Sequence, residues 1–239
     1  MGVDFVPVGV SRSPASRTES RPSPSPPPRR EPSRAAADRP ASRAAGPRSS
    51  EPAFALRAED YEVEQGDLPL DQRIEALRQL DEQYVRGCTR CALCSGRRNT
   101  VFGEGNPEAD VMFVGEGPGA DEDRTGRPFV GAAGELLDRQ IAAMTLRRED
   151  VYIANIVKCR PPGNRNPSLE EIDTCSGYLR RQIDIIRPKV IITLGGPATK
   201  HLLDTSRGIS AIRGRWHEYA GLLPKGPAID VMPTFHPAF

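Results

Sequence analysis

The chain has 239 residues, of which 37% are hydrophobic and 27% charged, and its formal net charge is +1. This composition suits one globular domain with room for an unstructured arm. The opening segment is too short and too interrupted, by Asp4 and Pro7, for a signal peptide, and no later segment approaches a membrane span, so secreted and membrane-spanning classes are excluded and a cytoplasmic or nucleoid-associated protein is expected.

Residues 1–66 are predicted to form a disordered arm and linker. Residues 1–50 contain nine arginines against four acids and ten of the 24 prolines, and residues 51–66 turn acidic. Such a segment has too little apolar surface to offset its ordering entropy. Its composition favours a solvated, dispensable tail over a basic tether for phosphate backbones. An organellar address is a further alternative for a start rich in arginine and serine.

The folded domain is predicted to span residues 67–239 and to open with a helix. Asp71 can cap this helix, and Ile74, Leu77 and Tyr84 lie on one apolar face of it. The helix is expected to end just before the first cysteine of the chain.

The cysteines are the feature that constrains the chemistry most. They form a tight trio, Cys88, Cys91 and Cys94, followed far downstream by Cys159 and Cys175. A two-residue gap lets two thiolates converge, and a cubic iron-sulfur cluster takes four thiolates that can come from distant parts of a chain. The wide second gap disfavours a zinc ribbon, and an odd count without a secretory signal disfavours disulfides. Spacing favours the cluster and leaves a zinc site or unrelated buried thiols open.

Apolar runs and helical patterns alternate along the rest of the chain. Strands are expected at residues 111–114, 151–157, 190–194 and 229–232, and helices near residues 132–144, 169–186 and 198–203. Near-continuous apolar strands alternating with helices indicate a mainly parallel four-stranded sheet covered on both faces, which is a three-layer α/β/α domain. In such folds, sites form beyond the carboxyl ends of the strands.

A glycine-rich loop, residues 115–119, follows the first strand, and a second one, residues 126–131, comes shortly after it. Glycines let the backbone approach a ligand closely and expose its amide donors. The first loop does not match a dinucleotide fingerprint, because no helix is expected to begin at its third glycine and no acid is spaced to bind a ribose. It also lacks the Gly-Lys-Ser/Thr of a P-loop. Alone, the loop is a weak signal of a ligand site.

Three side chains are expected at one edge of the sheet. Asn155 ends the second strand, His236 follows the fourth, and Phe129 lies in the second glycine-rich loop. Together they could hold a planar heterocycle through edge hydrogen bonds and a stacked ring. Each one alone is better explained by loop backbone, core packing or a polar gap. Their convergence on one sheet edge gives the two explanations equal weight.

Six motifs, in this order, resemble those of the family 4 uracil-DNA glycosylases, the iron-sulfur type found in thermophiles and many other bacteria. They are residues 101–107 (VFGEGNP), 115–119 (GEGPG), 128–131 (PFVG), 155–165, 213–214 (RG) and 236–238 (HPA). The resemblance covers residues 84–239, about two thirds of the chain, and is too long and too ordered for chance. It implies hydrolysis of the bond between uracil and deoxyribose in DNA, which leaves an abasic site for base excision repair.

The resemblance also implies a cofactor and a substrate pocket. Cys88, Cys91, Cys159 and Cys175 would bind a 4Fe-4S cluster, and Cys94 would be spare. Uracil flipped out of DNA would enter a pocket made by Glu116, Gly117, Pro118, Phe129, Asn155 and His236. The cluster would have no redox role. It would hold the long connection between its ligands and orient Lys158 and Arg160 toward phosphates.

Residue types in that pocket fit the implied chemistry. Phe129 offers a face on which a base can stack, and the Asn155 amide can accept from uracil N3–H while it donates to O4. Cytosine reverses both demands, so the amide must be held in one orientation. His236 is suited to stabilise the charge that gathers on uracil O2 as the glycosidic bond breaks.

Three residues are candidates for positioning the attacking water. The best-known uracil-DNA glycosylases have an aspartate for this purpose where this chain has Gly117. Glu122, which matches a family acid, is the candidate for placing water or for shaping the pocket, and Asn164 and Glu116 are weaker candidates. Catalysis would then rest mainly on stabilising the leaving group, with His236, Asn155 and Glu122 as the catalytic set.

The expected partner is uracil-containing DNA, single- or double-stranded, and the expected state is a monomer. Relatives continue beyond the position of Phe239 with Leu-Leu-Arg and a further helix, so the domain is expected to be truncated after its His-Pro motif. One alternative is a sister enzyme that traps DNA covalently through a histidine on an inserted basic loop, which residues 160–168 lack. Another is a non-catalytic, nucleic-acid-binding iron-sulfur module.

Overall fold

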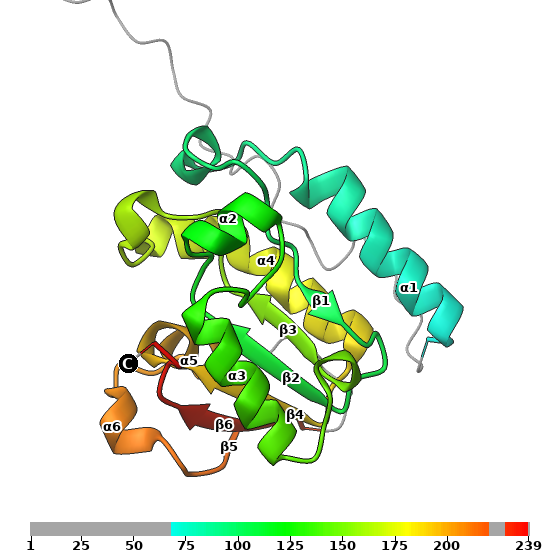
Figure 1. Cartoon of the computed structure of the whole chain (residues 1–239), viewed down its shortest axis with the longest axis vertical. Helices are drawn as coiled ribbons and strands as arrows, with labels where there is room; N and C mark the ends of the chain where they lie inside the picture. The colour runs from blue at the N-terminus through cyan, green and yellow to red at the C-terminus, as the bar shows by residue number, and fades with distance from the viewer. Residues whose placement is uncertain (1–67, 220–227, 239) are drawn as a thin grey trace, which may run out of the picture. The chain divides into compact units, whose positions relative to one another are not determined.

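The structure is a computed structural model that describes residues 68–219 and 228–238 (Figure 1). The predicted disordered arm, residues 1–66, lies outside the described residues. Within the described ranges, no helix is long and apolar enough to cross a membrane.

One mixed sheet forms the centre of the fold. Its strand order is β1-β3-β2-β4-β6-β5, and the four central strands run parallel. These are β3 (Tyr152–Asn155), β2 (Val111–Gly115), β4 (Val190–Leu194) and β6 (Asp230–Thr234). The predicted four-stranded parallel sheet is therefore confirmed. Two antiparallel edge strands, β1 (Glu104–Gly105) and β5 (His217–Glu218), were missed because two residues are too short for a hydrophobic pattern.

Helices cover both faces of the sheet, which confirms the three-layer arrangement. Helix α3 (Ala132–Ala143) lies on the near face in Figure 1, where Leu137 and Ile141 pack with Phe113 of β2. Helices α4 (Leu169–Ile186) and α5 (Gly196–Leu202) cover the other face and pack on Met112 and its neighbours. Because successive strand residues point to opposite faces, one short strand serves both layers.

Four further short segments lie among the described residues. They are the 3₁₀ turns η3 (Ala92–Ser95), η4 (Arg148–Asp150) and η5 (Pro162–Asn164), and the helix α6 (Ile209–Ile212).

The first helix differs from its prediction. Helix α1 (Leu70–Gln79) continues into the π-helical turn η2 (Leu80–Val85), and Asp71 lies in its first turn instead of capping it. Leu77 is buried as expected, but Ile74 is 49% exposed, so its assignment to the apolar face is wrong. Arg73 takes the buried position because its guanidinium donates to the carbonyl oxygen of Ile186, at 2.7 Å, near the end of α4.

A helix that was not expected follows the first glycine-rich loop. Helix α2 (Ala120–Thr125) begins directly after Gly119, which is the third glycine of that loop. The statement that no helix begins there is therefore wrong. Its acid-rich sequence gives no apolar period, and its N-terminus is held by Glu122, whose carboxylate accepts from the Gly119 N–H at 3.0 Å.

Candidate functional site

A cavity of about 320 Å³ opens beyond the carboxyl ends of β2 and β3. All the residues predicted for the substrate pocket line it: Glu116, Gly117, Pro118, Glu122, Phe129, Asn155 and His236. Sequence reasoning did not assign several further lining residues, namely Gly119, Ala133, Pro161, Arg165, Asn166, Pro167 and Ala238. The weaker candidate Asn164 lines the cavity as well. The fold thus brings four separate segments to one hollow.

Asn155 is the last residue of β3 and pairs with Gly115 of the neighbouring strand. Its side chain is 1% exposed, and its Oδ1 has no hydrogen-bond partner among the described residues. A buried acceptor without a donor costs about 1–3 kcal/mol. Gly115 makes room for this arrangement, since a Cβ there would lie 2.5 Å from Oδ1 and 2.6 Å from the Phe129 ring. A hydrogen-bond donor on a ligand in the cavity would satisfy this oxygen.

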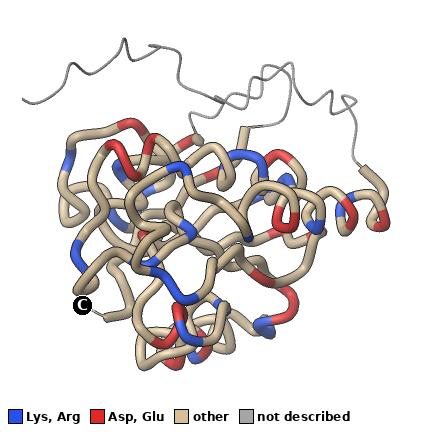
Figure 2. Tube along the Cα trace, turned by 90° about the horizontal axis from the view of Figure 1, so that it is seen from above, with Lys and Arg blue, Asp and Glu red and all other residues tan. Residues whose placement is uncertain are grey.

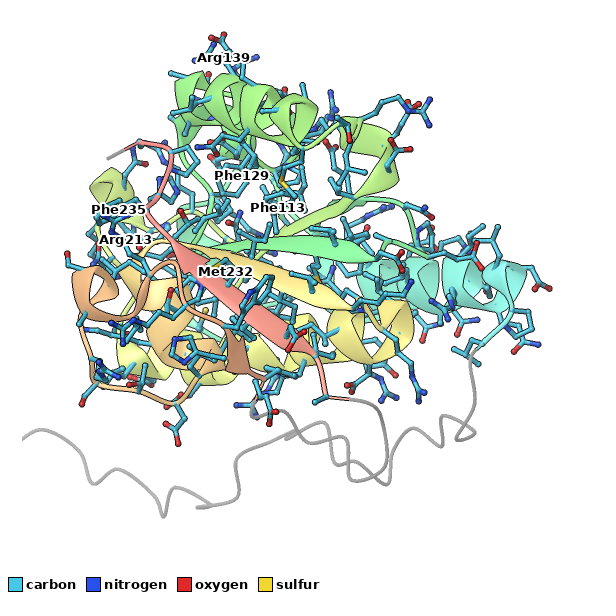
Figure 3. The ribbon with its side chains drawn as sticks, turned by 90° about the horizontal axis from the view of Figure 1, so that it is seen from below. Phe113, Phe129, Arg139, Arg213, Met232 and Phe235 are labelled. Atoms are coloured by element: carbon cyan, nitrogen blue, oxygen red, sulfur yellow. The ribbon has the colours of Figure 1, made fainter. Side chains whose placement is uncertain are left out.

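Phe129 is held in an uncommon backbone conformation. Its φ is 49°, a left-handed value that is strained for a bulky side chain and persists where the surroundings impose it. Gly134 of α3 lies so close that a Cβ there would be 1.9 Å from the Phe129 carbonyl oxygen. Arg148 donates to the Pro128 carbonyl at 2.5 Å. Figure 3 shows Phe129 beneath α3, and its ring centroid lies 5.7 Å from that of His236.

Glu122 joins the two glycine-rich loops. Besides the Gly119 amide, its carboxylate accepts from the Val130 N–H at 2.9 Å and the Gly131 N–H at 3.1 Å. The two loops carry Glu116 and Phe129 into the cavity. Three backbone donors hold the carboxylate, so its geometry suits shaping the pocket better than moving water.

Glu116 and His236 are the other ionisable groups of the cavity that sequence reasoning assigned. Burial raises the pKa of the Glu116 carboxyl. Burial lowers the pKa of His236, and the nearby charge of Glu122 partly opposes this shift. The Ala238 N–H donates to His236 Nδ1 at 3.1 Å, so a neutral ring carries its proton on Nε2. His236 can therefore donate through Nε2 while it is uncharged.

Arg213 supports the segment that carries His236. Its guanidinium lies 4.4 Å from the ring centroid of Phe235, the residue before His236, as Figure 3 shows at the end of β6. The Gly214 N–H donates to the Pro233 carbonyl at 3.0 Å. The Arg-Gly motif noted in the sequence thus packs beside the His-Pro motif.

Lys158 and Arg160 do not both face solvent. Lys158 is 1% exposed, so the expectation that it is oriented toward DNA phosphates is wrong. Two buried acceptors hold the side chain inside the fold: Lys158 Nζ donates to the Asn155 carbonyl at 2.8 Å and to Gln182 Oε1 at 2.6 Å. Arg160 is partly exposed and donates from Nε to Asn164 Oδ1 at 2.8 Å.

Basic and acidic residues are interspersed in the described part of the chain, and several of them form ion pairs. Figure 2 shows basic and acidic residues interspersed along the trace. Beside the cavity, Arg165 is paired with Glu171 at 2.7 Å, where Glu171 also closes the N-terminus of α4. The hydrogen bond from Arg165 holds the pKa of Glu171 near 2.

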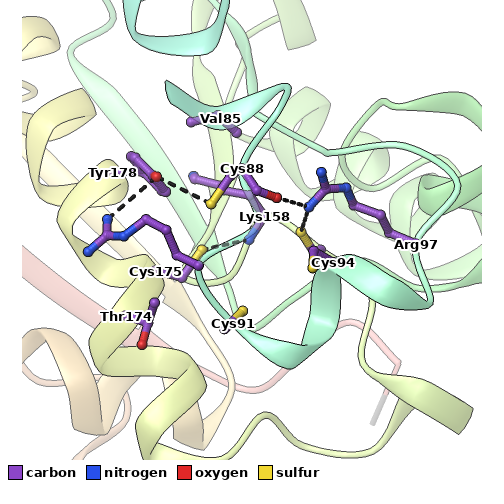
Figure 4. A pocket seen from close by; sticks show the side chains of 11 residues that line it. Val85, Cys88, Cys91, Cys94, Arg97, Lys158, Thr174, Cys175 and Tyr178 are labelled. Atoms are coloured by element: carbon purple, nitrogen blue, oxygen red, sulfur yellow. Dashed lines mark hydrogen bonds between the residues drawn. The ribbon is translucent and has the colours of Figure 1, made fainter. Parts of the chain in front are cut away.

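The five cysteines gather around a second hollow (Figure 4). The hollow between them has a volume of about 10 Å³ and is also lined by Arg97, Lys158 and Tyr178. Within the described ranges, no three His, Cys, Asp or Glu side chains are placed to hold a single metal ion. Each thiolate of a four-iron cluster binds a different iron atom, so such a ligand set surrounds a volume instead of meeting at one point. The donor set therefore fits a cluster.

Three of the four predicted ligands receive a hydrogen bond at sulfur. The Lys158 backbone N–H donates to Cys175 at 3.3 Å, Arg97 donates to Cys159 at 3.3 Å, and the Tyr178 hydroxyl donates to Cys88 at 3.4 Å. Such donors stabilise thiolate ligands. Arg97, Tyr178 and Lys158 were not assigned to this site from the sequence, and no motif identifies them because their contacts depend on the folded backbone.

Comparisons with a family model and with individual proteins indicate the same family. The model of the uracil DNA glycosylase superfamily matches residues 102–239. The chain is 46% identical over 170 residues to a type-4 uracil-DNA glycosylase of Sulfurisphaera tokodaii, a match that covers 69% of this chain and 76% of the relative. It is 46% identical to the type-4 enzyme of Thermotoga maritima, over 69% of this chain and 83% of the relative. It is 49% identical to that of Saccharolobus solfataricus, over 64% and 72%.

Proposed function

Because the chain belongs to the type-4 uracil-DNA glycosylases, within the uracil DNA glycosylase superfamily, we propose that the cavity beyond β2 and β3 holds uracil that has been flipped out of DNA. The chain is a DNA glycosylase, a hydrolase that excises uracil in DNA repair. The observation that carries the assignment of the cavity is the buried, unpartnered Oδ1 of Asn155.

Recognition of uracil rests on two side chains. Phe129 stacks on the base, and Asn155 accepts from uracil N3–H through Oδ1 while its amide nitrogen donates to O4. Cytosine has an acceptor at N3 and a donor at C4, so it opposes both groups of the amide. Leaving them unpaired costs about 1–3 kcal/mol each, which excludes cytosine from productive binding.

Bond cleavage rests on His236. As the bond between N1 and C1′ breaks, electrons move onto the base and the sugar becomes oxocarbenium-like. The neutral imidazole donates from Nε2 to uracil O2 and stabilises the departing anion. Water then adds to C1′ and loses a proton.

We assign Glu116 as the general base that accepts the proton from the attacking water. The Glu122 carboxylate is held by three backbone donors, whereas no hydrogen bond to the Glu116 carboxylate is found within the described ranges. The raised pKa of Glu116 makes it a better base than an exposed carboxylate. Glu122 and Asn164 then act on the shape of the cavity.

The cysteine site would hold a 4Fe-4S cluster through Cys88, Cys91, Cys159 and Cys175, and Cys94 would stay outside the ligand set. The four thiols and their hydrogen-bond donors support this assignment. The cluster would supply a structural link between the segment before β1 and the segment after β3, with no step of the reaction at the iron atoms. Replacing Cys159 by alanine should lose bound iron together with DNA affinity.

The proposal extends to the bounds of the domain, its oligomeric state, its location and the form of its DNA substrate. The folded domain would span residues 67–239 and act as a monomer in the cytoplasm or nucleoid on single- or double-stranded DNA. The phosphate contacts of such an enzyme make its affinity depend on salt.

One assay tests the function. The protein is incubated with an oligonucleotide that carries a single uracil, treated with alkali, and analysed on a denaturing gel beside a thymine-containing control. Strand cleavage only at uracil is expected, since alkali breaks the chain at an abasic site. A cross-linked band would indicate covalent trapping, and an intact strand would indicate a binding module; either outcome contradicts the proposal.

A further inference from the structure

Lys158 is a fully buried lysine whose amine binds Asn155, a residue that lines the proposed uracil pocket. Its side chain is 1% exposed and donates to two acceptors, the Asn155 carbonyl at 2.8 Å and Gln182 Oε1 at 2.6 Å. Its Nζ also lies 5.9 Å from the centroid of the Phe102 ring. Burying an amine costs several kcal/mol unless it is well bonded, and an apolar residue of similar length would fill the space without that cost. A lysine at this position therefore calls for a specific explanation.

The acceptor at the end of this side chain belongs to the residue that contacts uracil. Asn155 is the last residue of β3, and the Lys158 side chain turns back by three residues to bind its carbonyl oxygen. Gln182 of α4 fixes the amine from the other side, since its own amide donates to Phe102 and to the Tyr152 hydroxyl. The carbonyl oxygen of Asn155 is thus held by a buried hydrogen-bond network that consists of Lys158, Gln182 and their partners.

The backbone of Lys158 belongs to the cysteine site. Its N–H donates to Cys175 Sγ at 3.3 Å, its carbonyl accepts from Val101 at 2.8 Å, and the next residue is Cys159. Val157, which lies between Asn155 and Lys158, is bonded to the first glycine-rich loop, because its N–H donates to the Glu116 carbonyl at 3.1 Å. One short segment therefore forms the floor of the cavity at one end and the wall of the cysteine site at the other.

We propose that Lys158 is a positioning residue for uracil excision: it fixes the peptide unit of Asn155, and with it the position of the side-chain amide that binds uracil, and it joins this peptide unit to the cysteine site. This inference rests on the proposed function of the cavity. Lys158 contacts neither DNA nor the reacting atoms, so its effect on catalysis passes through Asn155.

The test is Lys158→Met, which keeps the length of the side chain and removes its donors. Lys189→Met is the matched control, because Lys189 is exposed and paired with Asp110. Displacing a positioned group by about 1 Å can cost roughly 10²-fold in rate. We expect Lys158→Met to lower kcat on uracil-containing DNA by about that factor, to raise the inhibition constant of free uracil in parallel, and to leave KM for DNA within about threefold. The control should match the parent protein.

A double-mutant cycle separates positioning from general support of the fold. In an Asn155→Ala background the amide is absent, so Lys158→Met should lower kcat by less than about threefold. A full loss in that background would overturn the proposal. Unchanged kcat and uracil inhibition in the single variant would overturn it as well.

Bound iron supplies the second measurement. Lys158→Met should be purified with its iron but release it to a chelator faster than the control. A variant whose kcat falls only in proportion to its iron content would show that Lys158 supports the cluster alone, and an unchanged rate of release would contradict the link to the cysteine site. Failure of the proposed function itself would appear differently, as an absence of uracil release by the parent protein.

Discussion

The Oδ1 of Asn155 is buried without a donor, and the protein bears that cost in every molecule that has no ligand. We predict that Asn155→Ala lowers kcat/KM on uracil-containing DNA by about 10²-fold or more, since two ligand hydrogen bonds of about 1–3 kcal/mol are lost. The same variant should unfold at an equal or higher temperature, because the orphaned acceptor is gone. Single-turnover kinetics and calorimetry measure the two quantities, and a variant that lost stability while it kept activity would show that the amide serves the fold.

The protonation of His236 sets an expectation for pH dependence. Burial lowers its pKa, so the ring stays neutral to a lower pH than a free histidine, with its proton on Nε2. We predict that kcat stays level from pH 8 down to about pH 6.5, the usual pKa of histidine, and falls only below it. His236→Gln should lower kcat by about 10²-fold or more and remove the acid limb that belongs to the imidazole.

The raised pKa of Glu116 would also contribute to that limb, because a protonated carboxyl no longer accepts a proton from water. Glu116→Gln therefore serves as the comparison, and it should retain the limb of His236. A profile of kcat that already fell between pH 8 and pH 7 would contradict the neutral imidazole.

Among the elements, helix α3 and the loop before it depend on close contact. A Cβ at Gly134 would lie 1.9 Å from the Phe129 carbonyl, a distance that forces the helix or the loop to move. We predict that Gly134→Ala displaces the Phe129 ring and lowers kcat/KM by about 10-fold to 10²-fold while bound iron is retained. Gly208→Ala is the matched control, since a Cβ there meets nothing within 4 Å. Equal activity of the two variants would contradict a role for the position of Phe129.

Elements that carry a local signal could be predicted from the sequence. Helix α4 was expected at residues 169–186 and has those bounds, because Ser168 and Glu171 form a capping box before a regular apolar stripe. Helix α2 has no apolar stripe, and long-range hydrogen bonds hold it in place: Glu122 accepts from the second glycine-rich loop, and Asp123 accepts from the Arg98 N–H. The position of a helix without an apolar stripe therefore depends on contacts with neighbouring segments of the folded chain.

In the candidate site too, some residues could be predicted from the sequence and others could not. Asn155, Phe129 and His236 could be predicted as neighbours, because the carboxyl ends of parallel strands share one sheet edge. The expectation for Lys158 was wrong, since a lysine in a basic stretch is usually exposed, and its burial depends on bonds to the Asn155 carbonyl and to Gln182, 24 residues away. Sequence patterns contain local order, whereas buried polar contacts require the complete fold.

For the whole molecule, the response of stability to pH is expected to depend on Asp184 of α4. Burial raises the pKa of this carboxyl from 3.8 to about 6, although the charges of Arg180, Arg181 and Arg187 oppose the shift. Tyr219 is the other ionisable group that interacts with it. The folded state therefore holds a proton that the unfolded state has released between pH 4 and pH 6. Stability falls as pH rises through this window, and the full loss persists above pH 6.

We predict that Asp184→Asn raises the unfolding temperature at pH 8 by about 2–4 °C, which corresponds to roughly 1 kcal/mol in a domain of this size. The asparagine resembles the protonated acid, so the difference between the two proteins should shrink to nothing near pH 4. Calorimetry at both pH values measures it, with Asp173→Asn as the control because Asp173 lies exposed on the same helix. If Asp184→Asn instead destabilised the protein at pH 8, attraction to the three arginines would outweigh the cost of burial, and the carboxylate would be a stabilising charge at the end of α4.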